Sequence, residues 1–565
     1  MAPPCLPVDV VPSFHKAARR LFLTATLADD NVLVTDFGAD PVSVSKPIVP
    51  KSASDLGDRL ILSPFEAEPG QDHAALRAFL ADLAKTHNTV VITPSDKRAL
   101  VWSDVANRVC SKDSIAETVD ELQRNHIGLV VFANRYDGID LPGDACRVLV
   151  IDGLPTFANP LERLDAAMVD GTESIARELM QRVEQGMGRG VRSNEDHCVV
   201  VLSDLSLARE VWTYGDRFFS PATAAQLGLS RQVAGQLRGT DLLELRSAID
   251  LVLGRDPTWV AASRAALAPI ESKTISEISE IAIAQRKSFE LAQDARHSEA
   301  VASMRTVIDT IEERPVRGWA KQLAAHYLYQ YDRVSADELQ KSAREDNRSA
   351  FRPIGSHLSP TLLKTTLSQS QASASQLQNR YGSPADALLG VEELVSRLRP
   401  DPEETKDFER AVEELGLLLG FGAQRPEQEY GAGPDVLWAL GDLSFLVIEC
   451  KSGSVSDSIH KAELAQLGHS ADWFASKYDA TCTATPVLIH PSRQCGRAAV
   501  AAAGTKVITF DRLAELLGRV REFAAAVAAD STFEAEAVGK RLMALELNAS
   551  GFASRWSQSV KPARS

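Results

Sequence analysis

The sequence predicts an α/β protein built from several domains. Its 565 residues are more than one hydrophobic core normally serves and suggest three domains. Short apolar runs typical of strands alternate with helical patterns in residues 1–217 and again in residues 401–525. Residues 218–400, which lie between them, carry helical patterns. We therefore expect two α/β domains joined by a helical connector, with a helical tail over residues 526–565.

The bulk composition restricts the class of protein. The net charge is −15, which argues against a protein that coats nucleic acid and leaves room for an enzyme with local basic clefts. The seven dispersed cysteines fit a reducing compartment better than a disulfide framework. Because the chain has no apolar run of about 18 residues and no signal-peptide pattern, we expect a cytoplasmic protein without a membrane partner.

Two segments of the first α/β region carry residues suited to phosphate chemistry. Residues 185–192 fit the pattern Gln-x-x-Gly-Arg-x-x-Arg. A guanidinium stays charged and binds phosphate oxygens in a fork, so Arg189 and Arg192 are candidates to contact phosphate. Taken alone, the same pattern would suit a helix end with cationic caps. Residues 128–143 form an apolar strand that ends in an acidic, glycine-bearing loop, Asp-Gly-Ile-Asp-Leu-Pro-Gly.

These segments resemble motifs of superfamily 2 helicases, most closely the DinG and XPD-like branch. In chain order, the resemblance covers motif III at residues 23–27, motif IV at 89–95, motif V at 128–143 and motif VI at 185–192. It implies a RecA-like second motor domain with a parallel sheet. The nucleotide-side residues that it implies are Gly138, Asp140, Gln185, Gly188, Arg189 and Arg192.

Other parts of such a motor are missing from the sequence. It contains neither a Gly-x-x-x-x-Gly-Lys-Ser/Thr loop to cradle phosphates nor an Asp-Glu-Ala-His-type box for magnesium. Met1 stands shortly before residues 23–27, so we expect only a remnant of the first RecA-like domain. ATP would then bind only with a complementary motor domain, supplied by a separate polypeptide that carries the Walker A loop.

The expected connector contains paired helical patterns at residues 300–308 and 319–331. They vaguely resemble tetratricopeptide hairpins and suit a helical spacer or docking module. Residues 365–383 are rich in Ser and Gln. They form either the linker to the last domain or a polar helix.

The second α/β region places acidic residues and a lysine around a strand pair. Asp435 precedes one strand-like segment, and Glu449 and Lys451 end the apolar run 443–448, with residues 438–442 expected as the turn. A hairpin would bring both carboxylates together. Carboxylate oxygens hold a hard divalent cation, and an ammonium can orient water and offset charge, as phosphodiester hydrolysis requires.

This arrangement resembles the PD-(D/E)XK nucleases, which have the restriction-endonuclease-like α/β/α fold. The expected order is a helix at 408–421, the hairpin, a helix at 461–473, and strands at 484–490 and 506–510. The resemblance implies Mg²⁺ or Mn²⁺ held by Asp435 and Glu449, with Lys451, Glu409 and Gln466 completing the catalytic set. Cys450 is expected on the opposite face of its strand, in the core.

Together, the two resemblances imply a helicase–nuclease component that processes DNA or RNA in genome maintenance or defence. Two alternatives stay open. The chain could be a non-catalytic module that docks nucleic acid or protein, or a truncated product of a longer helicase gene.

Overall fold

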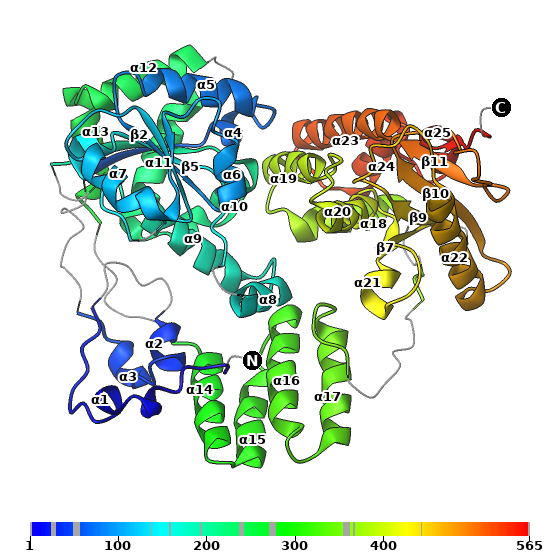
Figure 1. Ribbon diagram of the computed structural model, residues 1–565, viewed down its shortest axis with the longest axis horizontal. Coiled ribbons are helices and arrows are strands. Elements are labelled where there is room, and N and C mark those ends of the chain that lie inside the picture. The colour runs from blue at the N-terminus through cyan, green and yellow to red at the C-terminus, as the bar shows by residue number, and fades with distance from the viewer. Residues whose placement is uncertain are drawn as a thin grey trace. The chain divides into compact units, whose positions relative to one another are not determined.

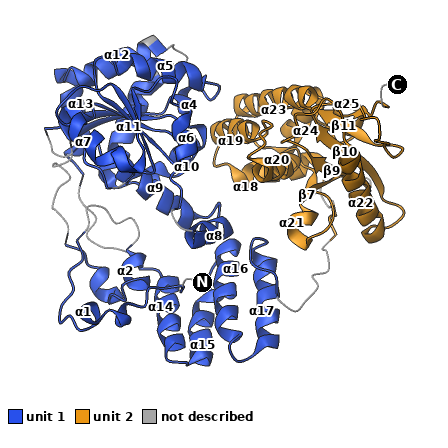
Figure 2. Ribbon diagram, in the orientation of Figure 1, with its two compact units in different colours: residues 1–356 blue, residues 357–565 orange. Residues whose placement is uncertain are grey.

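The computed structural model describes residues 3–23, 30–48, 57–136, 138–157, 160–191, 195–236, 242–270, 278–353, 362–364, 368–441 and 443–562. The chain divides into two compact units, residues 1–356 and 357–565 (Figure 2). Among the described residues, no helix is both long and apolar enough to cross a membrane.

The first unit contains a six-stranded parallel sheet (Figure 1). Its strands are β1 (Asp58–Leu62), β2 (Thr89–Thr93), β3 (Arg108–Val109), β4 (Leu129–Ala133), β5 (Val148–Ile151) and β6 (His197–Leu202). Their order across the sheet is β1-β6-β5-β2-β4-β3. The four central strands β2, β4, β5 and β6 are runs of Val, Ile and Leu and are almost wholly buried, as a parallel sheet covered on both faces requires.

Helices cover both faces of this sheet. One face packs against α7 (Ile115–Leu122), α9 (Glu173–Met187) and α10 (Leu205–Phe218). The other packs against α5 (His73–Leu83), α6 (Asp96–Leu100), α12 (Leu242–Leu253) and α13 (Pro257–Leu267). Beside β1 lies α11 (Pro221–Gln236). The helices of residues 221–267, expected in the connector, therefore belong to the first sheet, because their apolar faces complete its core.

A helical array follows in the same unit. Each of its four helices packs on the next: α14 (Glu280–Gln293), α15 (His297–Ile308), α16 (Arg314–Leu328) and α17 (Arg333–Asp346). The paired helices expected at residues 300–308 and 319–331 are α15 and most of α16. Asp346 ties the last two helices together, since it accepts hydrogen bonds from Arg317 and Lys321. The remaining short helices of this unit are α1 (Pro12–His15), α2 (Asn31–Thr35), α3 (Pro41–Val44), α4 (Pro64–Ala67) and α8 (Pro160–Met168).

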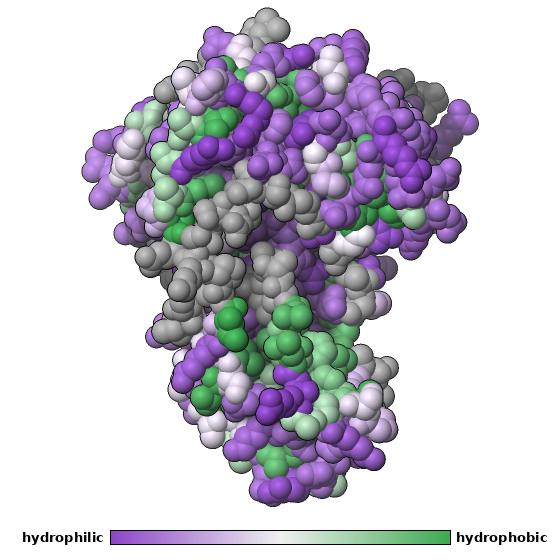
Figure 3. Space-filling view, turned by 90° about the vertical axis from the view of Figure 1, so that its left-hand side faces the viewer, coloured by the Kyte–Doolittle hydropathy of each residue, from purple (hydrophilic) through white to green (hydrophobic). Residues whose placement is uncertain are grey.

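The N-terminal segment carries exposed apolar side chains. Leu21, Leu23 and Ile48 are among the most exposed large hydrophobic residues of the described chain. On the face drawn in Figure 3, apolar residues form small groups within a mostly hydrophilic surface. Residues 24–27, the core of the expected motif III, lie outside the described residues.

The second unit contains a mixed six-stranded sheet with helices on both faces. Its strands, in spatial order, are β12 (Gln558–Ser559), β11 (Lys506–Thr509), β10 (Thr483–His490), β9 (Ser444–Cys450), β8 (Val436–Gly441) and β7 (Gly422–Gln424). Strands β9, β10 and β11 are parallel, and the other neighbouring pairs are antiparallel.

The two faces of this sheet are covered unequally. One face holds the larger core, with α18 (Gln369–Arg380), α19 (Pro384–Arg397), α20 (Thr405–Leu418), α23 (Phe510–Asp530), α24 (Ala535–Ala544) and α25 (Phe552–Trp556). The other face is covered by α22 (Lys461–Lys477). The short α21 (Pro426–Tyr430) precedes β8. The order of helix, hairpin, helix and two strands expected from the sequence is confirmed, whereas β7 was not foreseen.

One local expectation is wrong. Residues 438–441 are not a turn, because Trp438 is buried in the sheet and β8 continues to Gly441, which pairs with Ser444. Of the two alternatives for residues 365–383, a linker or a polar helix, the helix is confirmed over residues 369–380. Residues 369–380 form α18, whose apolar Ala374 and Leu377 enter the core.

Gly420 provides a test of this packing. It ends α20 with φ +78°, and a Cβ at this position would lie 2.1 Å from the backbone oxygen of Gln369. Gly420→Ala should therefore lower the unfolding free energy of the second unit by more than the roughly 1–2 kcal/mol of a left-handed alanine. Gly468→Ala in α22, where a Cβ meets nothing within 4 Å, should be neutral or stabilising by up to about 1 kcal/mol. Hydrogen exchange of the β8 and β9 amides measures both effects, and equal protection in the two variants would contradict the prediction.

Candidate active site

The hairpin of β8 and β9 brings Asp435 and Glu449 together. Val436 pairs with Ile448, so the residues just outside that pair, Asp435 and Glu449, come to the same place. The backbone N–H of Cys450 donates to Oδ2 of Asp435 at 2.8 Å, which fixes the first carboxylate against the end of β9. Both acids are buried, with 5% of Asp435 and 1% of Glu449 exposed.

Strand alternation decides which face of the sheet the acids occupy. Phe445 and Val447 belong to the cluster on the α22 side, and Glu449 continues this series. Leu446 and Ile448 face the larger core, and half-buried Cys450 packs against that core as expected. The carboxylates therefore lie on the face that α22 covers.

The buried pair shifts the acid–base behaviour of both side chains. Burial and the nearby charge of Asp435 raise the pKa of Glu449 to about 7. Burial also raises the pKa of Asp435, a change that the N–H of Cys450 partly opposes and the nearby Glu427 reinforces. Oε2 of Glu449 is buried without a hydrogen bond and lies 3.5 Å from Nζ of Lys451. An acceptor of this kind is suited to a cation.

Helix α22 holds the other oxygen of Glu449 and also the lysine. The hydroxyl of Ser470 donates to Oε1 of Glu449 at 2.6 Å. Nζ of Lys451 donates to Oε1 of Gln466 at 2.8 Å. The structure therefore brings Asp435, Glu449, Lys451 and Gln466 together. Ser470 was not foreseen, although it follows Gln466 by one helical turn, a spacing that places two side chains on one face.

Glu409 occupies a different set of contacts. It is buried on α20, where its Oε2 pairs with Nη2 of Arg425 at 2.7 Å and with Nζ of Lys406 at 3.1 Å. The described contacts of this carboxylate join it to these cations rather than to Asp435 or Glu449. Glu427 on α21, which the sequence did not single out, is the acid that acts on Asp435.

The two carboxylates could provide a metal ion with two protein ligands. Within the described ranges, no three His, Cys, Asp or Glu side chains gather in a way that would hold a metal ion. Magnesium is commonly bound through one or two carboxylates and keeps several waters. Asp435 and Glu449 therefore fit a hard cation that keeps several of its waters. They do not fit a cation that is coordinated by protein ligands alone.

In the first unit, the structure joins the loop that follows β4 to the end of α9. Arg189 donates from Nε to the backbone oxygen of Gln185 at 3.0 Å and from Nη1 to that of Ile139 at 3.0 Å. Gly138 and Asp140 flank Ile139 and are exposed, with Gly138 at φ +74°. Gly188 caps α9. Arg192 lies outside the described residues.

A buried charge lies at the carboxyl end of β5. Asp152 accepts hydrogen bonds from Arg98 and Trp102. Oδ1 of Asp152 also lies 3.1 Å from the His73 ring. Burial would raise its pKa, but the hydrogen bonds from His73 and Arg98 outweigh burial and lower it. The carboxylate is thus fully satisfied and acts as a structural anchor.

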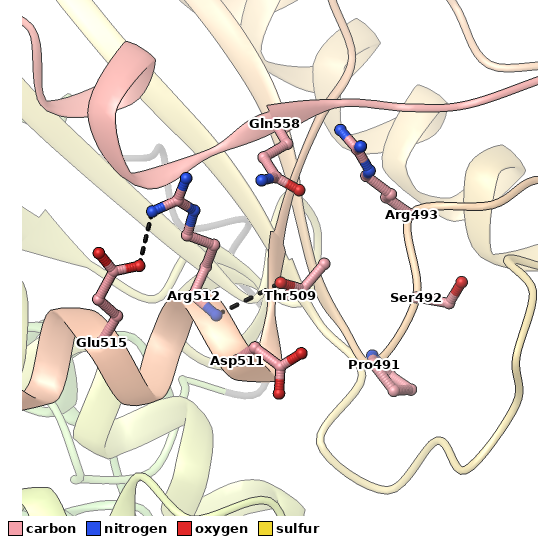
Figure 4. Close-up of a pocket in the computed structure, with 8 residues that line it drawn as sticks. All are labelled: Pro491, Ser492, Arg493, Thr509, Asp511, Arg512, Glu515 and Gln558. Carbon is pink, nitrogen blue, oxygen red and sulfur yellow. Dashed lines mark hydrogen bonds and ion pairs between the residues drawn. The ribbon is translucent and has the colours of Figure 1, made fainter.

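A cavity of about 510 Å³ opens at the carboxyl ends of β10 and β11 (Figure 4). Its lining includes Arg493 from the loop after β10, and Asp511, Arg512 and Glu515 from the start of α23. Arg512 is paired with Glu515. Cations and acids thus balance one another along the wall, and neither member of the carboxylate pair lines it.

Comparison with known proteins identifies part of the chain. Residues 75–220 match the family model of the helicase C-terminal domain. The match spans β2 to β6, the loop after β4 and the end of α9, and a helicase C-terminal domain at residues 75–220 implies a helicase-related role in nucleic-acid processing. The chain matches no curated protein.

The raised pKa of Glu449 has a consequence for stability. Its folded pKa of about 7 lies above the ordinary value of 4.5, so the folded state holds this proton more tightly than the unfolded state. In the metal-free protein, this contribution is complete below about pH 4.5 and is lost as the pH rises through 7. Glu449→Gln should therefore raise the unfolding free energy of the second unit at pH 8 but not at pH 4.5.

Unfolding of the metal-free variant and the wild type at both pH values checks this expectation, with the exposed Glu534→Gln as the control. Each unit of pKa difference corresponds to about 1.4 kcal/mol. A pH-independent difference between Glu449→Gln and the wild type would contradict the assigned environment of Glu449.

Proposed function

We propose that this chain is a DNA-processing helicase–nuclease component of the cytoplasm whose second unit hydrolyses phosphodiester bonds with a divalent cation. The observation that carries the proposal is the cluster of Asp435, Glu449 and Lys451 at one end of the β8–β9 hairpin. The order α20, β7, β8, β9, α22, β10 supports a PD-(D/E)XK nuclease fold. The helicase C-terminal domain in the same chain supports nucleic acid as the substrate.

The donor set suits Mg²⁺ or Mn²⁺. Two buried acids whose pKa values are both raised are stabilised when a cation offsets their charge. Oε2 of Glu449 has an open acceptor position for such an ion. When bound, the cation would polarise the phosphate and lower the pKa of a water molecule.

Each residue of the proposed site would then have a separate role. Asp435 and Glu449 would hold the cation and fix its position on the sheet. Lys451, whose ammonium lies between Glu449 and Gln466, would orient the attacking water and offset negative charge at the phosphate. Gln466 would position Lys451. Glu409, paired with Arg425 and Lys406, would support the end of α20 rather than complete the metal shell.

In the first unit, the proposed motor function is incomplete. Gln185, Gly188, Arg189, Gly138 and Asp140 form a connected surface suited to the nucleotide side of a motor cleft, and Arg192 would provide the finger. A phosphate-binding loop would come from a separate polypeptide. ATP is then a cofactor of the assembled motor and not of this chain alone.

The nuclease proposal predicts that the purified chain cuts DNA when Mg²⁺ or Mn²⁺ is present and stops when a chelator is added. Asp435→Ala and Lys451→Ala should each reduce cutting to the metal-free background, because one removes a cation ligand and the other the ammonium. Gel analysis of labelled DNA measures the rate.

Two exposed residues of α22 provide matched controls, since Asp472→Ala and Lys477→Ala remove the same charges away from the site. These controls should cut like the wild type. Thermal melting checks that Asp435→Ala and Lys451→Ala are folded. If the folded variants retain wild-type cutting rates, the proposed site is excluded.

The motor proposal predicts that the chain alone has no DNA-stimulated ATPase activity. A partner that carries a Walker A domain should restore it. Arg192→Ala should then reduce turnover by ~10³-fold or more, as removal of an arginine finger does. Phosphate-release assays with and without the partner measure this, and strong ATP hydrolysis by the isolated chain would refute the incomplete-motor assignment.

A further inference from the structure

Ser470 is a polar residue on the buried face of α22. It follows Leu467 by three residues and precedes Phe474 by four, and both of these side chains are buried against the sheet. Ser470 itself is only 4% exposed. A buried hydroxyl without a partner costs free energy, so the direction of its hydrogen bond is significant.

The hydroxyl of Ser470 donates to a side chain rather than to its own helix. A serine within a helix often bonds the carbonyl four residues earlier, which here is that of Gln466. Instead, Oγ lies 2.6 Å from Oε1 of Glu449, a short distance that is typical of a hydroxyl bound to a charged carboxylate.

This bond makes the two oxygens of Glu449 unequal. Oε1 is occupied by Ser470, whereas Oε2 is buried without a hydrogen bond and lies 3.5 Å from Lys451. The serine thereby fixes the rotation of the carboxyl group and determines which oxygen is left open beside Asp435 and Lys451. Four residues earlier on the same helix, Gln466 restrains Lys451.

We propose that Ser470 is a positioning residue that presents Oε2 of Glu449 to the divalent cation. The inference rests on the proposed function of the carboxylate pair. Together with Gln466, it makes α22 the element that orients both the acid and the lysine of β9. Groups that orient a metal ligand in this way typically contribute about 10- to 100-fold in metal affinity or activity.

The test is a Mn²⁺ titration of the full chain without DNA, followed by the electron paramagnetic resonance signal of free Mn²⁺. Ser470→Ala should weaken Mn²⁺ binding by about 10- to 100-fold, while Ser470→Thr, which keeps the hydroxyl, should restore most of it. Ser476→Ala is the matched control, because Ser476 is exposed on the same helix and donates to the carbonyl of Trp473. It should bind Mn²⁺ like the wild type.

Thermal melting separates this role from a purely structural one. If Ser470→Ala melts like the wild type and binds Mn²⁺ equally well, the inference is overturned. If Ser470→Ala does not fold, Ser470→Cys takes its place, because cysteine is close in size and a poor donor. Wild-type Mn²⁺ binding by the folded Ser470→Cys would then overturn the inference. Two results in the wild type would overturn the proposed nuclease and this inference together. The chain would show no Mn²⁺ binding that depends on Asp435, and it would not cut DNA. Wild-type cutting with an unaffected Ser470→Ala would overturn the inference alone.

Discussion

The antiparallel pairing of β8 with β9 is the constraint on which the candidate site depends. It buries Asp435 and Glu449 side by side, an arrangement that Coulomb repulsion and loss of hydration both oppose. The N–H of Cys450, the hydroxyl of Ser470 and the ammonium of Lys451 each offset part of this cost. The remainder appears as the raised pKa of both acids. The core around the hairpin, including Trp438 and Phe445, must therefore stabilise a site that is unfavourable by itself.

The two units show two ways to bury a carboxylate. Asp152 of the first sheet has no exposed surface, yet its pKa is lowered, because Arg98 and His73 outweigh the effect of burial. Glu449 is equally buried, but a second acid is its neighbour and one of its oxygens lacks a hydrogen bond. Buried charges whose partners satisfy them hold structure, whereas buried acids with a strongly raised pKa are typical of sites that bind or react. This contrast separates Glu449 from Asp152.

The sequence predicted the parts of the fold and site that depend on strand periodicity. Alternation along residues 443–451 was enough to place Glu449 and Lys451 on one face and Cys450 on the other. It could not show that Ser470 reaches Glu449, because a helical side chain finds its partner only through packing against another element. For the same reason, the sequence could not reveal that Arg425 forms an ion pair with Glu409.

Composition left alternatives open that only tertiary contacts decide. The Ser- and Gln-rich residues 365–383 suited a linker and a polar helix equally well, and the structure shows a helix whose Ala374 and Leu377 enter the core of the second unit. The helices of residues 221–267 carried no signal that would assign them to the first sheet, because their apolar faces would equally suit an independent bundle. Local pattern thus identified the elements themselves, while their assignment to a core required the packing.

Arg189 holds two segments together within the region that matches the helicase C-terminal domain. Two of its donors are already bonded to the carbonyls of Gln185 and Ile139, which ties the loop after β4 to the end of α9. Tyr136 strengthens the same region by donating to the carbonyl of Gly153. A side chain that holds a loop against the end of a helix in this way would lower the ordering cost of a ligand that binds there. In the proposed motor, Arg189 would therefore act through the shape of the surface that it maintains, and Arg192 would contact the γ-phosphate.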